Sequence, residues 1–384
     1  MKLTPLSLPF RSNAGSVSSP PRSFLQTPFW CEFKKDHGWR PFYFLIEDNP
    51  PRLLSVLVRP IKRYGDIAYV PLGPDIDCID SKEQGRILDS LAAELKRLLP
   101  KSVRYIRFDP PWFVQEQLST DGDSPELAAG PAFIRQRPDG SGCAAPVDIQ
   151  PPDTVVLNLP PLSVTDGEAR LLDAMKPKWR YNIKLGPKKG LKVDCYEGDS
   201  AIQTGLQIFW TLYLETAERD GIALHDKRYY QDLFTHAAAF ENTGFDKKRS
   251  VRVYIASHEG SPLAAIVTLF CGDEAVYLYG ASSNEKRNLM PAYALQWQAI
   301  RDARDFGCAR YDFYGIPPTD DETHPMHGLY RFKTGFGGTI IHRCGSIDYP
   351  CNALYYYAGR SAEVLRAVWF KKMKKMFRKN TRRK

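Results

Sequence analysis

Two kinds of hydrophobic spacing alternate along this chain, and together they predict a mixture of strands and helices. In the first half, short apolar or alternating runs indicate three strands, and residues 81–99 have apolar positions at helical spacing. Ser81 is the expected N-cap of this helix and Pro100 its stop. The three expected strands cover 53–58, 67–74 and 103–110.

The same kinds of element return in the second half. Helices are expected at 198–219 and 227–240, and a third at 291–306, where Gly307 ends it. Gly272-Asp273 separates two strand-like runs and is typical of a hairpin turn. The expected strands cover 251–256, 263–271, 274–282 and 308–315.

Two segments show neither spacing. Residues 1–23 are rich in Ser and Pro, and we expect them to fray. Residues 115–152 are rich in Gly, Pro, Asp and Ser and predict an irregular insertion with at most one short helix.

Each half therefore contains strands, a helix and an Arg-Tyr strand that ends at an acid. Tyr69 corresponds loosely to Tyr279, and Asp109 to Asp312. This repeat predicts an α+β fold built from two similar mixed α/β units, with a ligand site in the cleft between them. We place the units at 1–155 and 156–344, with 345–384 packing back on the first unit or forming a basic tail.

The charge of the chain is concentrated at one end. The 384 residues have a net charge of +9, and 371–384 contain nine Lys or Arg and no acid. Subtracting these nine from the 53 basic residues leaves 44, which equals the number of acidic residues. Such a tail attracts polyanions, either RNA phosphates or an anionic membrane surface, unless it is only a solvated helix end.

Other features restrict the class of protein. No apolar run reaches the roughly 18 residues that span a bilayer, and residues 1–10 lack the apolar core of a secretory signal. The eight cysteines are far apart without a CxxC pair, which suits free thiols in a reducing cytoplasm. No metal-ligand spacing, nucleotide-binding glycine loop or GxSxG motif is present, so we expect no metal.

The densest candidate for chemistry is GLYRFKTGFGG at 328–338. Its glycines allow a close approach of backbone to a ligand, and on a strand Arg331 and Lys333 would face the same side. We interpret it as a cationic, aromatic-lined pocket for a phosphate or a developing oxyanion. The alternative is a glycine-rich turn with solvated basic residues.

A second basic segment, 175–190, interleaves Lys and Arg with Trp and Tyr. That combination binds phosphates and stacks on bases, although an amphipathic helix with a solvated basic face has the same composition. Its candidate phosphate-binding residues, taken together with Arg331, are Lys176, Lys178, Arg180, Lys184, Lys188 and Lys189.

Seven motifs in a fixed order resemble the Fem family, the non-ribosomal peptidyltransferases that build the interpeptide bridges of peptidoglycan. The resemblance runs from about 24 to 350 and leaves out the N-terminus, the 115–150 insertion and the basic tail. The motifs are FLQTPFWxxxK (24–34), FDP (108–110), KPKWRYNIK (176–184), ETxxRDG (215–221), YGASS (279–283), RYDFYGI (310–316) and GLYRFKxGFGG (328–338).

The resemblance implies two tandem acetyltransferase-like (GNAT) domains, in agreement with the repeat. It also implies an aminoacyltransferase that moves an amino acid from aminoacyl-tRNA to a stem-peptide amine of UDP-MurNAc-pentapeptide or lipid II. The aminoacyl ester is already activated, so we expect no cofactor. There is no long helical hairpin, so the tRNA-binding coiled coil of some members is not expected.

The resemblance also implies roles for single residues. Lys34, beside Trp30, falls where family members contact the precursor's diphosphate, and Asp109 occupies the position proposed for base chemistry. Phe332 and Lys333 match the pair near the reacting ester and the tRNA end.

Three further residues are implied to line the precursor site: His225, Tyr229 and Tyr279. The family often has Arg where this chain has His225, which weakens a phosphate role there. Two rival functions stay open. One is an acyl-CoA-dependent N-acyltransferase on the same fold, and the other is a non-catalytic protein that binds RNA or a membrane surface.

Overall fold

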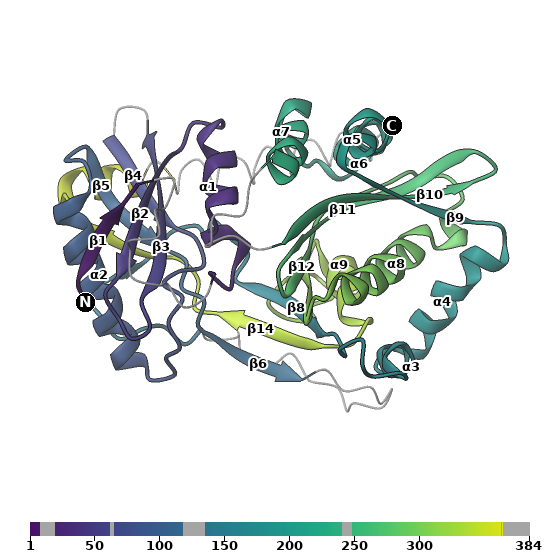
Figure 1. Ribbon diagram of the computed structural model, residues 1–384, viewed down its shortest axis with the longest axis horizontal. Helices are drawn as coiled ribbons and strands as arrows, with labels where there is room; N and C mark the ends of the chain where they lie inside the picture. The colour runs from purple at the N-terminus through teal and green to yellow at the C-terminus, as the bar shows by residue number, and fades with distance from the viewer. Residues whose placement is uncertain (8–19, 62–64, 118–134, 240–247, 362, 364–384) are drawn as a thin grey trace.

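The computed structural model describes residues 1–7, 20–61, 65–117, 135–239, 248–361 and 363, and these form two β-sheets side by side (Figure 1). The first sheet contains, in spatial order, β1 (Leu3–Leu6), β2 (Arg40–Ile46), β3 (Arg52–Ile61), β4 (Gly65–Val70), β5 (Val103–Phe108), β15 (Ile347–Pro350) and β7 (Cys143–Ala144). The second contains β6 (Phe113–Gln117), β14 (Thr339–Arg343), β8 (Asp153–Asn158), β13 (Arg310–Gly315), β12 (Glu274–Ser282), β11 (Ser261–Cys271), β10 (Arg249–His258) and β9 (Lys192–Glu197).

Helices cover these sheets. In the described residues they are α1 (Pro28–Lys35), α2 (Ser81–Leu98), α3 (Gly167–Asp173), α4 (Pro177–Lys188), α5 (Gly198–Ser200), α6 (Leu206–Asp220), α7 (Lys227–Ala239), α8 (Pro291–Phe306) and α9 (His327–Thr334). A π-helical turn at Ala201–Gly205 joins α5 to α6, and 3₁₀ turns lie at Phe24–Gln26 and Arg287–Leu289.

The two sheets repeat one topology. In the first, β1 to β4 pair antiparallel in chain order, and β4 then pairs parallel with β5 through the crossover helix α2. In the second, β9 to β12 pair antiparallel and β12 pairs parallel with β13 through α8. A parallel pair requires such a crossover, so each unit is an antiparallel meander closed by one β-α-β step. The predicted α+β fold of two similar units is confirmed.

Two strands return to the sheets from a distance. After α9 the chain enters the second sheet as β14 and then the first sheet as β15, with Gly345 at φ +79° between them. The predicted boundary between residues 155 and 156 lies inside β8, and β6 pairs with β14 in the second sheet. The division at residue 155 stays a prediction.

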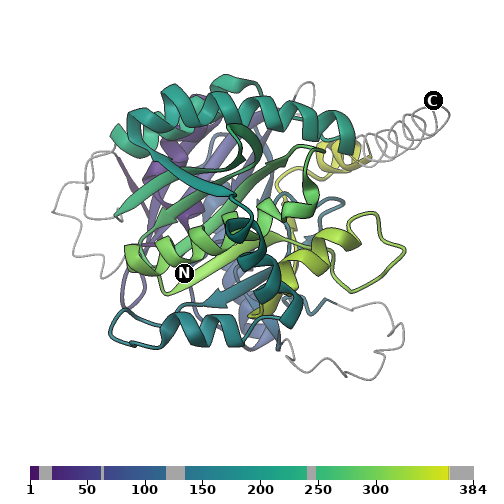
Figure 2. The same cartoon turned by 90° about the vertical axis from the view of Figure 1, so that its right-hand side faces the viewer.

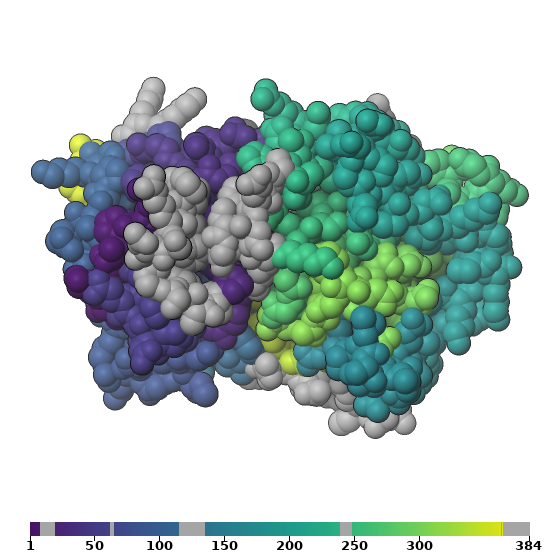
Figure 3. Space-filling model, in the orientation of Figure 1, coloured from purple at the N-terminus to yellow at the C-terminus, as the bar shows by residue number. Residues whose placement is uncertain are grey.

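One hydrophobic core spans both units. Buried side chains of α1 and β3 pack with those of α6, α7, β10 and β11, so α1 and α7 lie against each other at the junction (Figure 1). A second core lies between the other face of the second sheet and α3, α4 and α8 (Figure 2). A third lies under α2. The space-filling view shows the two parts of the chain meeting as one continuous body (Figure 3).

Several predicted elements match and others do not. Helix α8 has the predicted bounds, α2 and α7 match within a residue, and Gly272-Asp273 forms the β11–β12 turn. Asp80, not Ser81, caps α2 through a hydrogen bond to the amide of Glu83. The expectation of a frayed start is wrong for β1, which pairs with β2, while 8–19 lie outside the described residues.

The sequence prediction also missed α1 and β2 and described 328–338 as a loop or strand, whereas His327–Thr334 is a helix. The part of the 115–152 insertion that the structure describes includes two strand segments, in β6 and β7, and no helix. Among the helices that the structure describes, none is both long and apolar enough to cross a bilayer.

Candidate active site

The parallel strands of the second unit separate after three residues. Pairing of β12 with β13 ends at Val276 opposite Asp312, although β12 continues to Ser282. A β-bulge in β12 places Tyr277 opposite Thr268 and Tyr279 opposite Val267. Because a bulge adds one residue to the alternation, the two tyrosines join the cores on opposite faces of the sheet. Strands β12 and β13 therefore diverge at the point where Tyr277 and Tyr279 of β12 point to opposite faces of the sheet.

Lys333 of α9 enters this divergence. Its ammonium donates hydrogen bonds to the carbonyl oxygens of Gly315, at 2.8 Å, and Tyr314, at 3.3 Å. It also lies 5.3 Å from the centre of the Tyr277 ring. The residue is only 5% exposed, and burial lowers its pKa to about 7, an effect that nearby Asp312 partly offsets. A buried ammonium with a lowered pKa is a frequent feature of functional sites.

The residues next to Lys333 on α9 differ in burial according to their position around the helix. Phe332 is half-buried, packs on Tyr293 at 5.1 Å, and its carbonyl accepts a hydrogen bond from the Trp179 indole at 2.9 Å. Arg331 is exposed. The expectation that Arg331 and Lys333 face the same side is wrong, because two residues along a helix differ by about 200°.

The glycines after α9 serve close packing. A Cβ on Gly335 would lie 2.1 Å from the Trp179 ring. Gly337 and Gly338 have φ of +85° and +96°, and a Cβ on either would lie 2.5 Å from the carbonyl oxygen of Ala174 or Val156, respectively. These glycines seat α9 against the α3–α4 connection and β8, which fixes the position of Lys333.

A second ammonium, half-buried, lies at the junction of the units. Lys34 of α1 is surrounded by aromatic rings, with its nitrogen 5.7 Å from the centre of Trp30, 5.8 Å from Phe33 and 5.1 Å from Tyr229. It lies 3.4 Å from the Tyr229 hydroxyl. Burial, reinforced by the charge of Arg59, lowers the pKa of Lys34 to about 8. This cage joins α1 of the first unit to α7 of the second.

His225 and Tyr279 complete the cage on the second unit. The exposed His225 ring stacks on Tyr229 with the centroids 4.0 Å apart. Partial burial and the charge of Lys34 lower the pKa of His225. The hydroxyls of Tyr229 and Tyr279 form a hydrogen bond. The structure thus brings Lys34, Trp30, Tyr229, His225 and Tyr279 together, and their role in binding the precursor stays a prediction.

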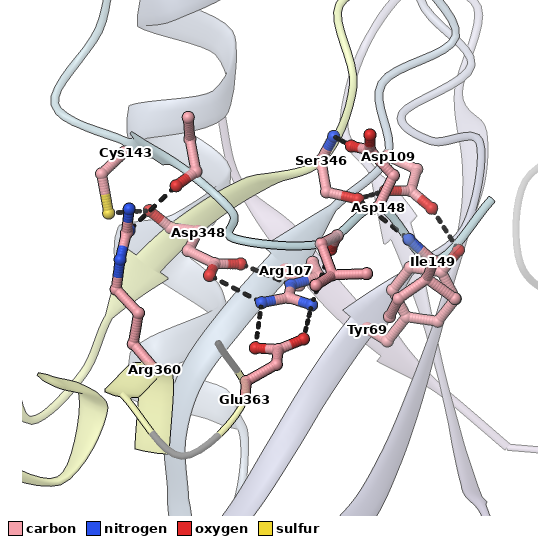
Figure 4. Close-up of polar contacts among 12 residues, drawn as sticks. Tyr69, Arg107, Asp109, Cys143, Asp148, Ile149, Ser346, Asp348, Arg360 and Glu363 are labelled. Atoms are coloured by element: carbon pink, nitrogen blue, oxygen red, sulfur yellow. Dashed lines mark hydrogen bonds and ion pairs between the residues drawn. The ribbon is translucent and has the colours of Figure 1, made fainter. Parts of the chain in front are cut away.

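Asp109 follows β5 and is 4% exposed. It accepts hydrogen bonds from the hydroxyls of Tyr69 and Ser346 (Figure 4). It also accepts one, at 3.2 Å, from the backbone amide of Gln150. Burial raises the pKa of Asp109 to about 6 against the effect of these three donors. A carboxylate has about four acceptor positions, so one is left for a proton from a ligand.

The position of Asp109 depends on a buried ion network two residues earlier. Arg107 donates to both oxygens of Asp348, at 2.7 and 2.9 Å, and to both oxygens of Glu363, at 2.9 and 3.1 Å (Figure 4). Asp348 is opposite Arg107 in the β5–β15 pairing. Since Ser346 precedes β15, the same strand pair holds the serine hydroxyl against Asp109.

Polar contacts connect Asp109 to Lys333. The Tyr314 hydroxyl donates to the side-chain oxygen of Gln150, and the backbone amide of Gln150 donates to Asp109. The Tyr314 carbonyl accepts a hydrogen bond from Lys333. Tyr314 has φ +61°, an uncommon conformation for a residue with a side chain. In this conformation its hydroxyl contacts Gln150 while its carbonyl contacts Lys333. The two candidate catalytic groups therefore belong to one contiguous site.

The predicted phosphate-binding lysines are exposed. They are Lys176, Lys178, Lys184, Lys188 and Lys189. On α4, Lys178, Lys184 and Lys188 share one face with Tyr181, which is 63% exposed. Arg180 instead donates to the carbonyl oxygens of Leu172, Asp173 and Met175 at the end of α3. The Arg180 guanidinium therefore stabilises the fold at the end of α3 instead of facing solvent with the lysines.

Sequence reasoning missed several residues of this site, among them Tyr69, Gln150, Tyr314, Arg343 and Ser346. Tyr69 and Tyr314 stand in segments that the sequence analysis used for the repeat, but nothing local marks Gln150, Arg343 or Ser346. In the first unit Tyr69 lies opposite Arg107, two residues before Asp109. In the second unit Asp312 lies opposite Val276, and the pairing of β12 with β13 ends before Tyr279. The strand register therefore does not keep the loose equivalence of Tyr69 with Tyr279 and of Asp109 with Asp312. Within the described residues, no three His, Cys, Asp or Glu side chains converge as metal ligands.

Comparison with known proteins places this chain in a family. The family model described as FemAB family matches residues 16–243 and 239–363. Two lipid II:glycine glycyltransferases are similar over most of their length. That of Staphylococcus epidermidis is 23% identical, over 88% of this chain and 91% of its own, and that of Staphylococcus aureus is 24% identical, over 88% and 90%.

The crystal structure of FemX has the same fold, with a TM-score of 0.66 and 19% identity over 89% of this chain and 96% of its own. The predictions of the family, of the two-unit fold and of a transferase are therefore confirmed. The chain belongs to the FemAB family.

Proposed function

We propose that this protein transfers an amino acid from aminoacyl-tRNA to an amine on the stem peptide of a peptidoglycan precursor. The observation that supports it most is the buried Lys333 ammonium between the diverging strands β12 and β13, connected through Tyr314 and Gln150 to Asp109. The names of the two similar staphylococcal transferases support a lipid II or related acceptor.

Each group has a task in this reaction. The acceptor amine attacks the ester carbonyl and loses a proton to Asp109, while Lys333 stabilises the oxyanion of the tetrahedral intermediate. The intermediate then collapses to the new amide, the ester bond to the tRNA ribose breaks, and the ribose oxygen leaves as a hydroxyl after taking the proton from Asp109. Holding amine and ester together removes roughly 7–11 kcal/mol of the barrier. An oxyanion donor contributes roughly 2.7–4 kcal/mol more. Phe332, the residue before Lys333, packs on Tyr293 and Phe336, and its proposed task is to limit where the ester can lie.

The cage around Lys34 is the proposed contact for the precursor's diphosphate. An anion there would restore the ammonium charge that burial disfavours. Trp30, Tyr229, Tyr279 and His225 shape this end of the acceptor site. The exposed face of α4 is the proposed contact for tRNA, with its lysines on phosphates and Tyr181 on a base. Arg331, exposed on α9, is a further candidate contact.

The basic segment 371–384 lies outside the described residues. We propose that it attaches a cytoplasmic protein to the inner face of the plasma membrane, where a lipid-linked acceptor is found. Each basic residue near an anionic surface contributes on the order of 1 kcal/mol.

The deciding experiment incubates the full chain with charged tRNAs and either UDP-MurNAc-pentapeptide or lipid II, with the product read by mass spectrometry. We expect one aminoacyl residue to be added, and Lys333→Ala to reduce the rate. Addition of an acyl group from acyl-CoA but of nothing from charged tRNA would instead support the rival N-acyltransferase. Binding of RNA or vesicles without any transfer would support the non-catalytic alternative.

A further inference from the structure

Arg343 is the last residue of β14 and lines a narrow pocket together with Asp109, Gln150, Gly345 and Leu72. Its backbone is fully used, since its amide donates to Pro152 at 2.8 Å and its carbonyl accepts from Arg135 at 2.9 Å. The main chain is therefore fixed, and only the guanidinium is available for another task.

The guanidinium has fewer partners than the other arginines buried nearby. Arg107 makes paired hydrogen bonds to two carboxylates, and Arg135 makes a paired contact with Asp153. The Arg343 side chain is 15% exposed, and its one carboxylate partner among the described residues is Asp312 at 4.0 Å. Asp312 already accepts from the Thr154 hydroxyl and, at 2.7 Å, from the Tyr314 amide.

A guanidinium has five donors, and at 4.0 Å its contact with Asp312 is an ion pair too long for a hydrogen bond. An anion that enters the pocket can pair with this guanidinium more closely than Asp312 does. A carboxylate fits better than a phosphate, because Asp109 and Asp312 lie close by and would repel a dianion more strongly. A planar carboxylate also matches the guanidinium fork with two parallel hydrogen bonds.

We propose that Arg343 binds a carboxylate of the acceptor peptide and thereby places the neighbouring amine beside Asp109. This inference rests on the proposed function and extends it to the chemistry of the acceptor. The enzyme would then select an acceptor in which a free carboxylate lies close to the reacting amine.

The test pairs a change in the enzyme with a change in the acceptor. UDP-MurNAc-pentapeptide is prepared with its peptide carboxylates amidated one at a time, and kcat/KM is measured for wild type, Arg343→Gln and Arg343→Lys. We expect one amidation to lower the wild-type value by roughly 10- to 100-fold, the range for removing a charge-assisted hydrogen bond. Arg343→Gln should show the same decrease with the unmodified acceptor and no further decrease with that amidated one.

The kcat/KM of Arg343→Lys should lie between those of wild type and Arg343→Gln, because lysine keeps the positive charge but cannot make two parallel hydrogen bonds. Arg301→Gln is the control, since Arg301 makes a surface ion pair with Glu168 away from the pocket, and its kcat/KM should be unchanged. Equal decreases for every acceptor, or a raised KM for aminoacyl-tRNA instead, would overturn the inference. Thermal unfolding midpoints show whether each variant is folded.

Binding of the same precursors without a donor, followed by calorimetry, separates this inference from the proposed function. If charged tRNA gives no transfer but binding of the precursor still depends on both Arg343 and one carboxylate, the carboxylate site stands and the transfer proposal fails. If transfer occurs and binding is indifferent to both changes, the proposed function stands and the carboxylate site is wrong.

Discussion

The ammonium nitrogen of Lys333 lies 2.8 Å from the carbonyl oxygen of Gly315, beyond the point where β12 stops pairing with β13. A helix residue thus satisfies backbone acceptors that a neighbouring strand would satisfy in a continuous sheet. The arrangement keeps the two strands apart and leaves a buried positive charge between them. Both properties suit a group that must meet a carbonyl carbon and its developing negative charge.

The first prediction concerns the charge of Lys333. Its pKa is about 7 in the folded protein, against an ordinary value of 10.5, so between these values the unfolded chain binds more protons. Stability should therefore rise as pH increases from about 7 to 10, and Lys333→Met should show less of this rise. Urea unfolding of both proteins across this range is the measurement.

The same substitution should lower the transfer rate by roughly 10²- to 10³-fold, as for removal of other oxyanion donors. A Met variant with wild-type kcat would exclude Lys333 from the reaction.

The second prediction concerns Asp109, whose pKa is raised to about 6 from an ordinary value of 3.8. Between these values the folded protein binds more protons, so Asp109 should make stability fall as pH rises from 4 to 6. As a base it must be ionised, so kcat/KM should fall as pH drops below about 6. Asp109→Asn should remove the fall in stability between pH 4 and 6 and should abolish most of the activity. An Asn variant that kept the wild-type rate and pH profile would limit Asp109 to positioning Tyr69 and Ser346.

Adjacent lysines on α1 provide a third prediction. Lys34→Met should raise the KM for the precursor by roughly 10- to 100-fold with a smaller change in kcat, because the diphosphate would no longer meet a charged donor. Lys35→Met is the control, since Lys35 is exposed and, in the part of the chain that the structure describes, pairs only with Glu32, at 3.1 Å. Steady-state kinetics with varied precursor distinguishes them. Equal KM values for the two variants would contradict the diphosphate role.

Local sequence signals predicted the elements whose ends they mark. Helix α8 begins at Pro291 and ends before Gly307, which has φ +98°, and both residues have those preferences on their own. The hairpin at Gly272-Asp273 is equally local. Helix α9 was missed because glycines lie within it and after it, so its density of glycine resembled a loop, although Gly335 and its successors serve packing against α4 and β8.

The site itself depended on interactions that no local pattern contains. Ser346 reaches Asp109 across 237 positions of the chain, and Arg107 reaches Asp348 across 241. The resemblance to a family supplied Lys34, Asp109 and Lys333, but not Gln150 or Arg343. Arg343 reaches the site because β14 and β15 return to different sheets, and Gln150 reaches it in the segment between β7 and β8.

A fourth prediction tests how α9 is seated. Gly335→Ala should destabilise the protein by about 1–3 kcal/mol, because its Cβ would lie 2.1 Å from the Trp179 ring. Gly328→Ala, within the same helix, meets nothing within 4 Å and should stabilise by about 0.5–1 kcal/mol. Denaturant unfolding gives both values. If the two alanines had the same effect, the packing of Gly335 on Trp179 would not be what positions Lys333.

The fifth prediction separates the basic residues of α4 by their surroundings. Lys184 and Lys188 are exposed on the face that contains Tyr181, so Lys184→Gln with Lys188→Gln should weaken tRNA binding. The slope of log Kd against log salt should fall by roughly 0.7–0.9 for each phosphate that is no longer neutralised. Arg180→Gln should leave that slope unchanged and lower the unfolding temperature, because its guanidinium satisfies carbonyls at the end of α3. Filter binding of tRNA at several salt concentrations, with thermal unfolding alongside, gives both quantities. A salt slope that responded to Arg180 and not to the two lysines would move the tRNA contact away from the exposed face of α4.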